Sequence, residues 1–300
     1  MSVAIQSLPS SSRDAAGLAV RLGVPFHEIG IHGFPDGEMR VTAGPASATT
    51  IIYASLDRPN DKLIALLFAA EALRRGGAKR LVLVAPYLCY MRQDTAFHEG
   101  EAISQKVIGP LLARCIDRVV TVDAHLHRTP DIRAVFPGIQ ADNLSAMPAI
   151  SDTLLKAGLD PATVVAGPDA ESLPWVSDLA GRLGLPYTVA RKTRRGDRSV
   201  AIEFQDRACI AGCPVLIVDD IVSSGGTIIA CAKALTAAGA TAVDAVVTHA
   251  LFPEAACKQM TSSGIRSIRS TRSVPHFTNA IVLDELFADA LKGELAEASQ

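Results

Sequence analysis

The segment from Val215 to Thr227 constrains the fold more than any other part of the chain. An apolar run, Val215–Val218, is followed by the carboxylates Asp219 and Asp220 and then by a turn rich in hydroxyl groups and glycines. This order predicts a buried strand, a loop and a helix that begins near Thr227. A helix N-terminus after a glycine-rich loop favours negative charge, so the segment indicates an anion-binding site.

The side chains of this loop narrow the choice of ligand. Ser223, Ser224 and Thr227 offer hydroxyl donors. Gly225 and Gly226 let backbone N–H groups approach a phosphate closely. The two carboxylates before the loop would repel a phosphate, so we expect them to bind sugar hydroxyls or a Mg²⁺ ion that phosphates also bind. The segment therefore predicts a site for a phosphorylated sugar, and the plain alternative is an ordinary strand–turn–helix corner.

Apolar strands and helical segments alternate along the chain in two series. The pattern Ala-Leu, then Gly-Ala, then an apolar strand occurs at 72–78 and again at 234–240. Hydrophobic residues make up 49% of the sequence and aromatic residues 5%, and this preference for small aliphatic side chains suits helices packed on parallel sheets. We therefore expect the α/β class, with two similar doubly wound parallel-sheet domains.

The expected domains divide the chain near its midpoint. An N-terminal α/β domain is expected over 1–145 and a C-terminal α/β domain over 146–283, with 284–300 packing back on the first. A helix is expected over Ser12–Leu22, and another over Asn143–Ala157 close to the boundary.

Charge and composition exclude several classes of protein. The formal net charge of −2 predicts no general attraction to nucleic acid or to a membrane surface. No apolar run reaches the roughly 18 residues that span a bilayer, and the first residues lack the pattern of a signal peptide. The six cysteines are scattered, mostly in apolar segments, and form no zinc-binding pattern. We therefore expect a cytoplasmic protein whose partners include neither nucleic acid nor a membrane.

Polar side chains follow two predicted strands of the first half. The strand at 81–85 runs into Arg92-Gln-Asp94, and the strand at 118–122 leads to His125 and His127. In an open α/β sheet, ligands bind at the carboxyl edge, where these residues would lie. The histidines are candidate contacts for a metal or a phosphate, and an ordinary polar loop is the alternative.

Two further segments carry candidate ligand-binding groups. The sequence Phe34-Pro-Asp-Gly-Glu38 predicts a turn that needs no function to explain it. Phe34 could nevertheless stack on a purine, with Asp36 and Glu38 accepting from its amino group. The basic run at 191–198 predicts a loop that could supply cations, and a solvated surface patch is the alternative.

Together these motifs resemble the ribose-phosphate diphosphokinases, also called PRPP synthetases. The chain carries the motifs in the family's order: Phe34-Pro-Asp-Gly-Glu38, Tyr90-Met-Arg-Gln-Asp94, Gly100-Glu-Ala-Ile-Ser104, Val122-Asp-Ala-His125, Gly167-Pro-Asp169, Lys192-Thr-Arg194 and Val218–Thr227. Phosphoribosyltransferases share only the last motif, and the forms of the last two are more similar to the archaeal-type branch. The resemblance implies domains of phosphoribosyltransferase type, with ATP on the N-terminal side and ribose 5-phosphate on the C-terminal side.

The resemblance also implies the reaction and the residues that serve it. The family transfers the diphosphoryl group of ATP to the anomeric hydroxyl of ribose 5-phosphate, giving PRPP and AMP, with Mg²⁺ as cofactor. By resemblance, ATP would be held by Phe34, Asp36, Glu38, Arg92, Gln93 and Asp94. Ribose 5-phosphate would be held by Asp219, Asp220, Ser223, Ser224, Gly225, Gly226 and Thr227. Mg²⁺ would be linked to His125 and Asp169, and Lys192 and Arg194 would be catalytic cations that close over the β-phosphate.

The family resemblance implies self-association as well, because the Phe-x-Asp-Gly-Glu loop commonly completes the ATP site of a neighbouring subunit. Two alternatives stay open. A phosphoribosyltransferase would not need the segments Phe34–Glu38 or Arg92–Asp94. A non-catalytic homologue that regulates a true synthetase would be indicated by loss of Lys192, Arg194, His125 or the acidic pair Asp219 and Asp220, and all of them are present.

Overall fold

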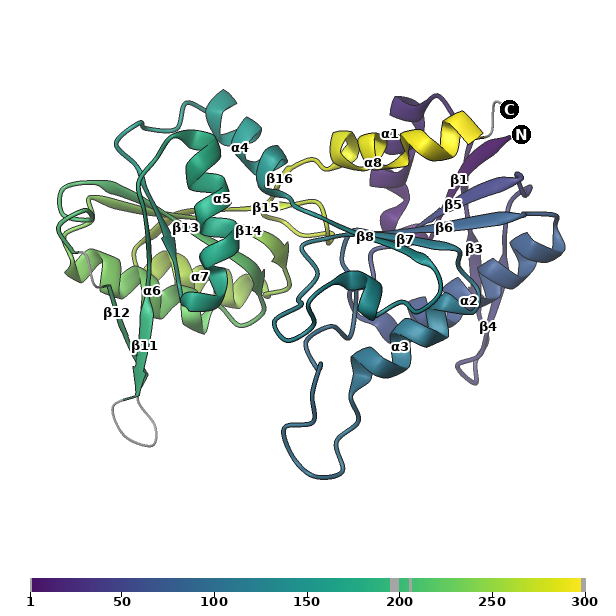
Figure 1. The fold of residues 1–300 in the computed structure, drawn as a ribbon, viewed down its shortest axis with the longest axis horizontal. Helices are drawn as coiled ribbons and strands as arrows, with labels where there is room; N and C mark the ends of the chain where they lie inside the picture. The colour runs from purple at the N-terminus through teal and green to yellow at the C-terminus, as the bar shows by residue number, and fades with distance from the viewer. Residues whose placement is uncertain (1, 195–199, 205–206, 298–300) are drawn as a thin grey trace. The chain divides into compact units, whose positions relative to one another are not determined.

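The computed structural model describes residues 2–194, 200–204 and 207–297. The chain forms two compact units, each built around its own six-stranded sheet (Figure 1). The first unit consists of the residues up to Ser145, the short segment Ser273–Pro275 and the chain from Leu283 onward. The second consists of Ala146–Arg272 and His276–Val282. The expected α/β class with two similar parallel-sheet domains is thereby confirmed.

The sheet of the first unit is entirely parallel, with the strand order β2-β1-β5-β6-β7-β8. Its strands are β1 (Val3–Ser7), β2 (Phe26–Glu28), β5 (Thr49–Tyr53), β6 (Arg80–Ala85), β7 (Arg118–Val122) and β8 (Gln140–Leu144). Its helices are α1 (Ser12–Leu22), α2 (Pro59–Arg75), α3 (Ser104–Ala113) and α8 (Asp284–Glu297), with short 3₁₀ turns at Pro9–Ser11 and Ile132–Ala134. Helices lie on both faces of the sheet (Figure 1), which explains why every residue of β1 and β5 is buried.

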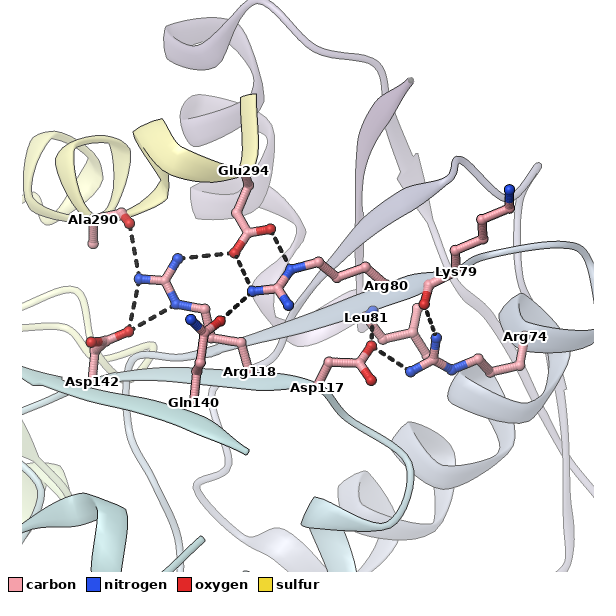
Figure 2. A network of polar contacts seen from close by, with 10 residues as sticks. All are labelled: Arg74, Lys79, Arg80, Leu81, Asp117, Arg118, Gln140, Asp142, Ala290 and Glu294. Carbon is pink, nitrogen blue, oxygen red and sulfur yellow. Dashed lines mark hydrogen bonds and ion pairs between the residues drawn. The ribbon is translucent and has the colours of Figure 1, made fainter. Parts of the chain in front are cut away.

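The last helix, α8, is fixed to the first unit through a buried carboxylate (Figure 2). Glu294 accepts hydrogen bonds from Arg80 and Arg118, and its side chain is only 3% exposed. Arg118 also bonds to Asp142 and to the carbonyl oxygen of Ala290. These contacts join α8 to the first residues of β6 and β7 and to β8.

The second unit repeats the topology of the first. Its parallel sheet has the order β10-β9-β13-β14-β15-β16, so both sheets place their first strand between the second and the third. The strands are β9 (Val164–Gly167), β10 (Tyr187–Val189), β13 (Pro214–Val222), β14 (Ala242–Ala250), β15 (Ile265–Thr271) and β16 (Asn279–Ile281). The helices are α4 (Met147–Lys156), α5 (Leu173–Leu183), α6 (Gly226–Ala237) and α7 (Glu254–Ser262), and Ala170–Ser172 forms a 3₁₀ turn. In such folds the topological switch point, where the strand order reverses, is the preferred ligand site.

Each unit also carries an antiparallel hairpin between its second and third sheet strands. In the first unit the hairpin is β3 (Gly30–Gly33) with β4 (Met39–Thr42). In the second it is β11 (Arg191–Arg194) with β12 (Val200–Glu203). The equivalent insertion carries the Phe34–Glu38 turn in one unit and Arg191–Arg194 of the basic run in the other.

The structure corrects one expected element. The helix expected over Asn143–Ala157 begins only at Met147, because Asn143 and Leu144 extend strand β8 and pair with Thr121 and Val122 of β7. Within the described parts of the chain, no helix is long and apolar enough to cross a membrane.

Candidate active site

Strained backbone marks the carboxyl edge of the first sheet. Among the described residues, three that are not glycine have positive φ: Arg58 (47°), Tyr90 (62°) and Asp123 (39°). They follow β5, β6 and β7 respectively, so three neighbouring strand ends each hold one. Such conformations cost about 1–3 kcal/mol each and concentrate at functional sites. The edge that general rules assign to ligands is therefore also where this unit stores strain.

The turn Phe34–Glu38 is a rigid tip on the β3–β4 hairpin. The N–H of Gly37 donates to the carbonyl of Phe34 (3.0 Å), and Gly37 itself has a φ of 94°. One oxygen of Asp36 accepts from the N–H of Glu38 (3.1 Å). Phe34 remains 41% exposed, with the ring of His32 against it edge-on at 5.0 Å between centroids. The turn thus holds an aromatic ring partly open to solvent beside two acids.

A pocket of about 390 Å³ adjoins this turn. Phe34 and Glu38 line it on the hairpin side, and Lys62 lines it from α2. The ammonium of Lys62 pairs with Asp57 (2.6 Å) and also donates to the carbonyl of Ser55 (2.9 Å). Neither Lys62 nor Asp57 belongs to a motif, so neither could be selected from the sequence.

In the segment after β6, the carboxylate of Glu101 accepts three hydrogen bonds. One oxygen of Glu101 accepts from the side-chain amide of Gln93 (3.2 Å) and from the backbone N–H groups of Phe97 (2.9 Å) and His98 (3.2 Å). Arg92, just before Gln93, is exposed. Glu101 therefore helps to order the loop that carries three of the predicted ATP-binding residues, Arg92, Gln93 and Asp94.

The loop after β7 carries His125 and is anchored to β8. Its backbone is fixed by two bonds, from the N–H of Asp123 to the carbonyl of Leu144 (2.9 Å) and from the N–H of Ala124 to the Oδ1 of Asn143 (2.8 Å). The rings of His125 and His127 contact each other edge-on, with 3.8 Å between centroids.

In the second unit, Asp169 follows β9, and Asp219 lies within the neighbouring strand β13, at the switch point. Strands β9 and β13 pair in register, with Ala166 opposite Ile217. Burial raises the pKa of the Cys231 thiol on α6 above its ordinary value, and the carboxylates of Asp219 and Asp169 raise it further. Both acids therefore act electrostatically on the same point, which indicates concentrated negative charge at this strand edge.

Three carboxylates here are oriented by backbone N–H groups. An oxygen of Asp169 accepts from Glu171 (3.1 Å) and caps the 3₁₀ turn that follows. Asp219 accepts from the N–H of Asp220 (3.1 Å), and Asp220 accepts from that of Ile221 (2.8 Å). Asp220 is only 5% exposed. Fixed oxygen ligands of this kind are those that Mg²⁺ prefers.

The predicted phosphate loop has the expected form. Gly225, with a φ of 78°, is the N-cap of α6, and the helix begins at Gly226. A Cβ on Gly225 would lie 3.0 Å from the sulfur of Met260, so only glycine fits without strain. Ser223, Ser224, Gly226 and Thr227 are exposed. The first N–H groups of α6 therefore emerge beside exposed hydroxyl-bearing residues.

The predicted site residues are divided between the two units. Phe34, Asp36, Glu38, Arg92–Asp94 and His125 belong to the first, and Asp169, Lys192, Arg194 and Asp219–Thr227 to the second. The backbones of Lys192 and Arg194 pair with Ile202 and Val200 in the β11–β12 hairpin. Their side chains, and residues 195–198 of the basic run, lie outside what the structure describes.

Comparisons with known proteins all indicate the same family. The model of the N-terminal domain of ribose phosphate pyrophosphokinase matches residues 3–115, and the phosphoribosyl transferase domain model matches residues 148–283. Ribose-phosphate pyrophosphokinase 2 of Archaeoglobus fulgidus is 34% identical over 281 residues, which cover 94% of this chain and 97% of that protein. Ribose-phosphate pyrophosphokinase of Bradyrhizobium diazoefficiens is 33% identical over 300 residues, covering 95% and 92% respectively.

A solved structure shares the fold over the whole chain. The crystal structure of phosphoribosylpyrophosphate synthetase from Mycobacterium smegmatis matches with a TM-score of 0.86 and 24% identity. The match covers 99% of this chain and 100% of the other. At this level of identity the likeness concerns the fold.

Proposed function

Because the chain belongs to the ribose-phosphate pyrophosphokinase family, we propose that it transfers the diphosphoryl group of ATP to the anomeric hydroxyl of ribose 5-phosphate, giving PRPP and AMP. The observation that supports this most is the carboxyl end of β13 together with the loop that follows it. They combine two oriented carboxylates on the strand, exposed hydroxyls in the loop and the N-terminus of α6. That combination suits a sugar phosphate, since donors meet the phosphate and acceptors meet the sugar.

On the acceptor side, the N–H groups of Gly226 and Thr227 would bind the 5-phosphate. The hydroxyls of Ser223, Ser224 and Thr227 would add donors. Asp219 and Asp220 would accept from the ribose hydroxyls, since both are already held by backbone N–H groups and lose little freedom on binding. The sugar would thus be fixed at both ends, with its anomeric hydroxyl left to react.

On the donor side, Phe34 would stack on the purine, and Glu38 with Asp36 would accept from its amino group. Arg92 and Gln93 would bind the triphosphate. Diphosphoryl transfer needs little covalent chemistry from the protein, but it needs alignment of the hydroxyl with the β-phosphorus and stabilisation of the shifting charge.

We further propose that Mg²⁺ binds with the substrates, with Asp169 and His125 as its candidate ligands. The carboxylate oxygens of Asp169 and Asp219 are ligands that suit this ion. Burial is the main reason why the pKa of the Cys231 thiol is raised, and the negative charges of Asp219 and Asp169 raise it further. A bound Mg²⁺ neutralises phosphate charge. Lys192 and Arg194 would stabilise the charge that develops on the β-phosphate and the leaving AMP, and a cation is most effective there when water is excluded.

The deciding measurement is AMP formation from ATP in the presence of ribose 5-phosphate and Mg²⁺. We expect AMP and PRPP to appear in equal amounts, and no AMP without ribose 5-phosphate. Consumption of PRPP with a nucleobase would instead indicate a phosphoribosyltransferase. Binding of ribose 5-phosphate without AMP formation would indicate a non-catalytic homologue. Omitting Mg²⁺, with a chelator added, tests the metal requirement.

We also propose that the chain self-associates and works in the cytoplasm, with no nucleic acid or membrane as partner. The turn Phe34–Glu38 stands at the tip of a hairpin, where a neighbouring subunit could be reached. Light scattering after size-exclusion chromatography tests this proposal, and a strictly monomeric mass with full activity would contradict it.

A further inference from the structure

Arg128 joins the two loops that follow β6 and β7. Its backbone N–H donates to one oxygen of Asp94 (3.1 Å), and its guanidinium donates to the other (2.9 Å). The Asp94 side chain is 2% exposed, whereas that of Arg128 is 57% exposed. The carboxylate is therefore enclosed and engaged through both oxygens, and the arginine covers it from the solvent side.

Two more contacts strengthen this junction. The Arg128 guanidinium carbon lies 5.5 Å from the centroid of the Phe97 ring, within the range of a cation–π contact. The hydroxyl of Thr129 donates to the side-chain oxygen of Gln105 (2.7 Å). Residues 128 and 129 thus bond to both ends of the segment from Asp94 to Gln105.

We propose that Arg128 is a positioning residue, which holds Arg92 and Gln93 in place for ATP by clamping Asp94. The expected effect on KM for ATP rests on the proposed function, whereas the contact between Arg128 and Asp94 does not. The proposal also reassigns Asp94, which the family resemblance placed among the ATP contacts. A carboxylate whose side chain is 2% exposed and whose two oxygens both face Arg128 offers a nucleotide little surface, and its charge would repel a triphosphate.

The clamp also reaches the other loop of the site. Arg128 is three residues after His125, so the pair fixes the end of the His125 loop against the Arg92–Gln93 segment. An exposed ion pair in isolation contributes little to the stability of a protein. Here loss of the arginine would remove both the cation that pairs with Asp94 and the side chain that covers it, which favours rearrangement of the loop.

The first test compares Arg128→Ala with a matched control, Arg133→Ala. Arg133 has the same charge and lies on the same connection, but it pairs with Asp131 only two residues away and its side chain is 75% exposed. We expect Arg128→Ala to raise KM for ATP about tenfold, a loss typical of one charged hydrogen bond. KM for ribose 5-phosphate should change less, and Arg128→Lys should restore part of the loss. Arg133→Ala should resemble the wild type.

A double-mutant cycle separates positioning from direct contact. If Asp94 acts only through Arg128, Asp94→Asn and the double variant Asp94→Asn/Arg128→Ala should show the same KM for ATP as Arg128→Ala. Additive losses would mean that Asp94 and Arg128 contact ATP independently and would overturn the proposal.

Hydrogen exchange without substrates tests the clamp separately from activity. The N–H groups of Phe97 and His98 should exchange faster in Arg128→Ala than in the wild type, while Arg133→Ala leaves them unchanged. If exchange and KM are both unaffected by Arg128→Ala, the clamp is refuted. If exchange rises but the wild type forms no AMP, the clamp stands and the proposed reaction fails.

Discussion

Replacing Glu294 by alanine tests how α8 stabilises the first unit. The carboxylate accepts from Arg80 at 2.6 and 2.9 Å and from Arg118 at 3.0 Å, and its side chain is 3% exposed (Figure 2). Removing one partner of a buried ion pair costs about 3–5 kcal/mol, because the remaining charge is left without compensation. That range is the starting point for the prediction.

The expected cost of Glu294→Ala is below this range, because Arg80 and Arg118 each keep another partner when Glu294 is removed. Arg118 retains Asp142 at 2.7 Å, and Arg80 retains Gln140. Their side chains are 14% and 27% exposed, so water reaches both. We therefore expect Glu294→Ala to lower the free energy of unfolding of the first unit by about 2–3 kcal/mol. Glu294→Gln keeps one acceptor oxygen and should cost about half as much.

The effect should depend on pH in a defined direction. Burial alone would raise the pKa of the Glu294 carboxyl, but hydrogen bonds and charges from Arg80 and Arg118 outweigh burial and hold this pKa below its usual range. Such a group contributes stability that is present above its unfolded-state pKa and is lost as the pH falls through the folded-state value. The difference between the wild type and Glu294→Gln should therefore be greatest near neutral pH and shrink below about pH 4.3.

Urea unfolding followed by circular dichroism is the assay. Fluorescence of Trp175, the single tryptophan, reports separately on the second unit. A loss of about 2 kcal/mol corresponds to a midpoint shift of about 1 M urea. The control is Glu285→Ala on the same helix, whose carboxylate is 74% exposed and pairs with Arg21 at 3.0 Å, and which should cost less than about 1 kcal/mol. Equal shifts for the two variants would refute the reasoning.

Three further substitutions test other features. Gly225→Ala should raise KM for ribose 5-phosphate about tenfold, because φ is 78° and the new Cβ would meet Met260; an unchanged KM would contradict the phosphate-loop role. Lys192→Ala should lower kcat far more than it weakens ATP binding in a binding titration, and equal losses would argue against action in the transition state. Gly109→Ala should lower the melting temperature, since its Cβ would overlap the carbonyl oxygen of Val135 and overpacking costs about 1–3 kcal/mol; an unchanged melting temperature would contradict that packing.

Strong local signals allowed much of the fold to be predicted. The helix Ser12–Leu22 has its expected bounds and ends at Gly23 in the left-handed conformation. The apolar run Val215–Val218 correctly predicted a buried strand, and the glycines correctly predicted the start of a helix, which begins at Gly226. Strand β8 was missed because its sequence, Gln-Ala-Asp-Asn-Leu, has no apolar run. It forms through pairing with β7 at the sheet edge, which local sequence does not reveal.

The candidate site was predictable to the extent that motifs mark strand ends. Arg92–Asp94, His125 and Asp169 follow β6, β7 and β9, as alternation of strands and helices suggested. The clamp between Asp94 and Arg128 was not predictable, because the two residues are far apart in sequence and a lone arginine carries no signal of its partner. Motif membership also suggested one role for all three residues Arg92–Asp94, although only the structure reveals that Asp94 is enclosed.

The repeated topology explains why the phosphate loop alone could not identify the reaction. Both units have the same strand order, so the parallel sheets themselves do not distinguish them. The differences lie in what is attached to equivalent positions. The hairpin between the second and third strands ends in an aromatic and acidic turn in one unit and contains Arg191–Arg194 of the basic run in the other. Among the described residues, only the first unit has the aromatic turn and the Asp94–Arg128 pair, which we propose to serve the donor nucleotide. The reaction is therefore specified by insertions and loops on a duplicated scaffold.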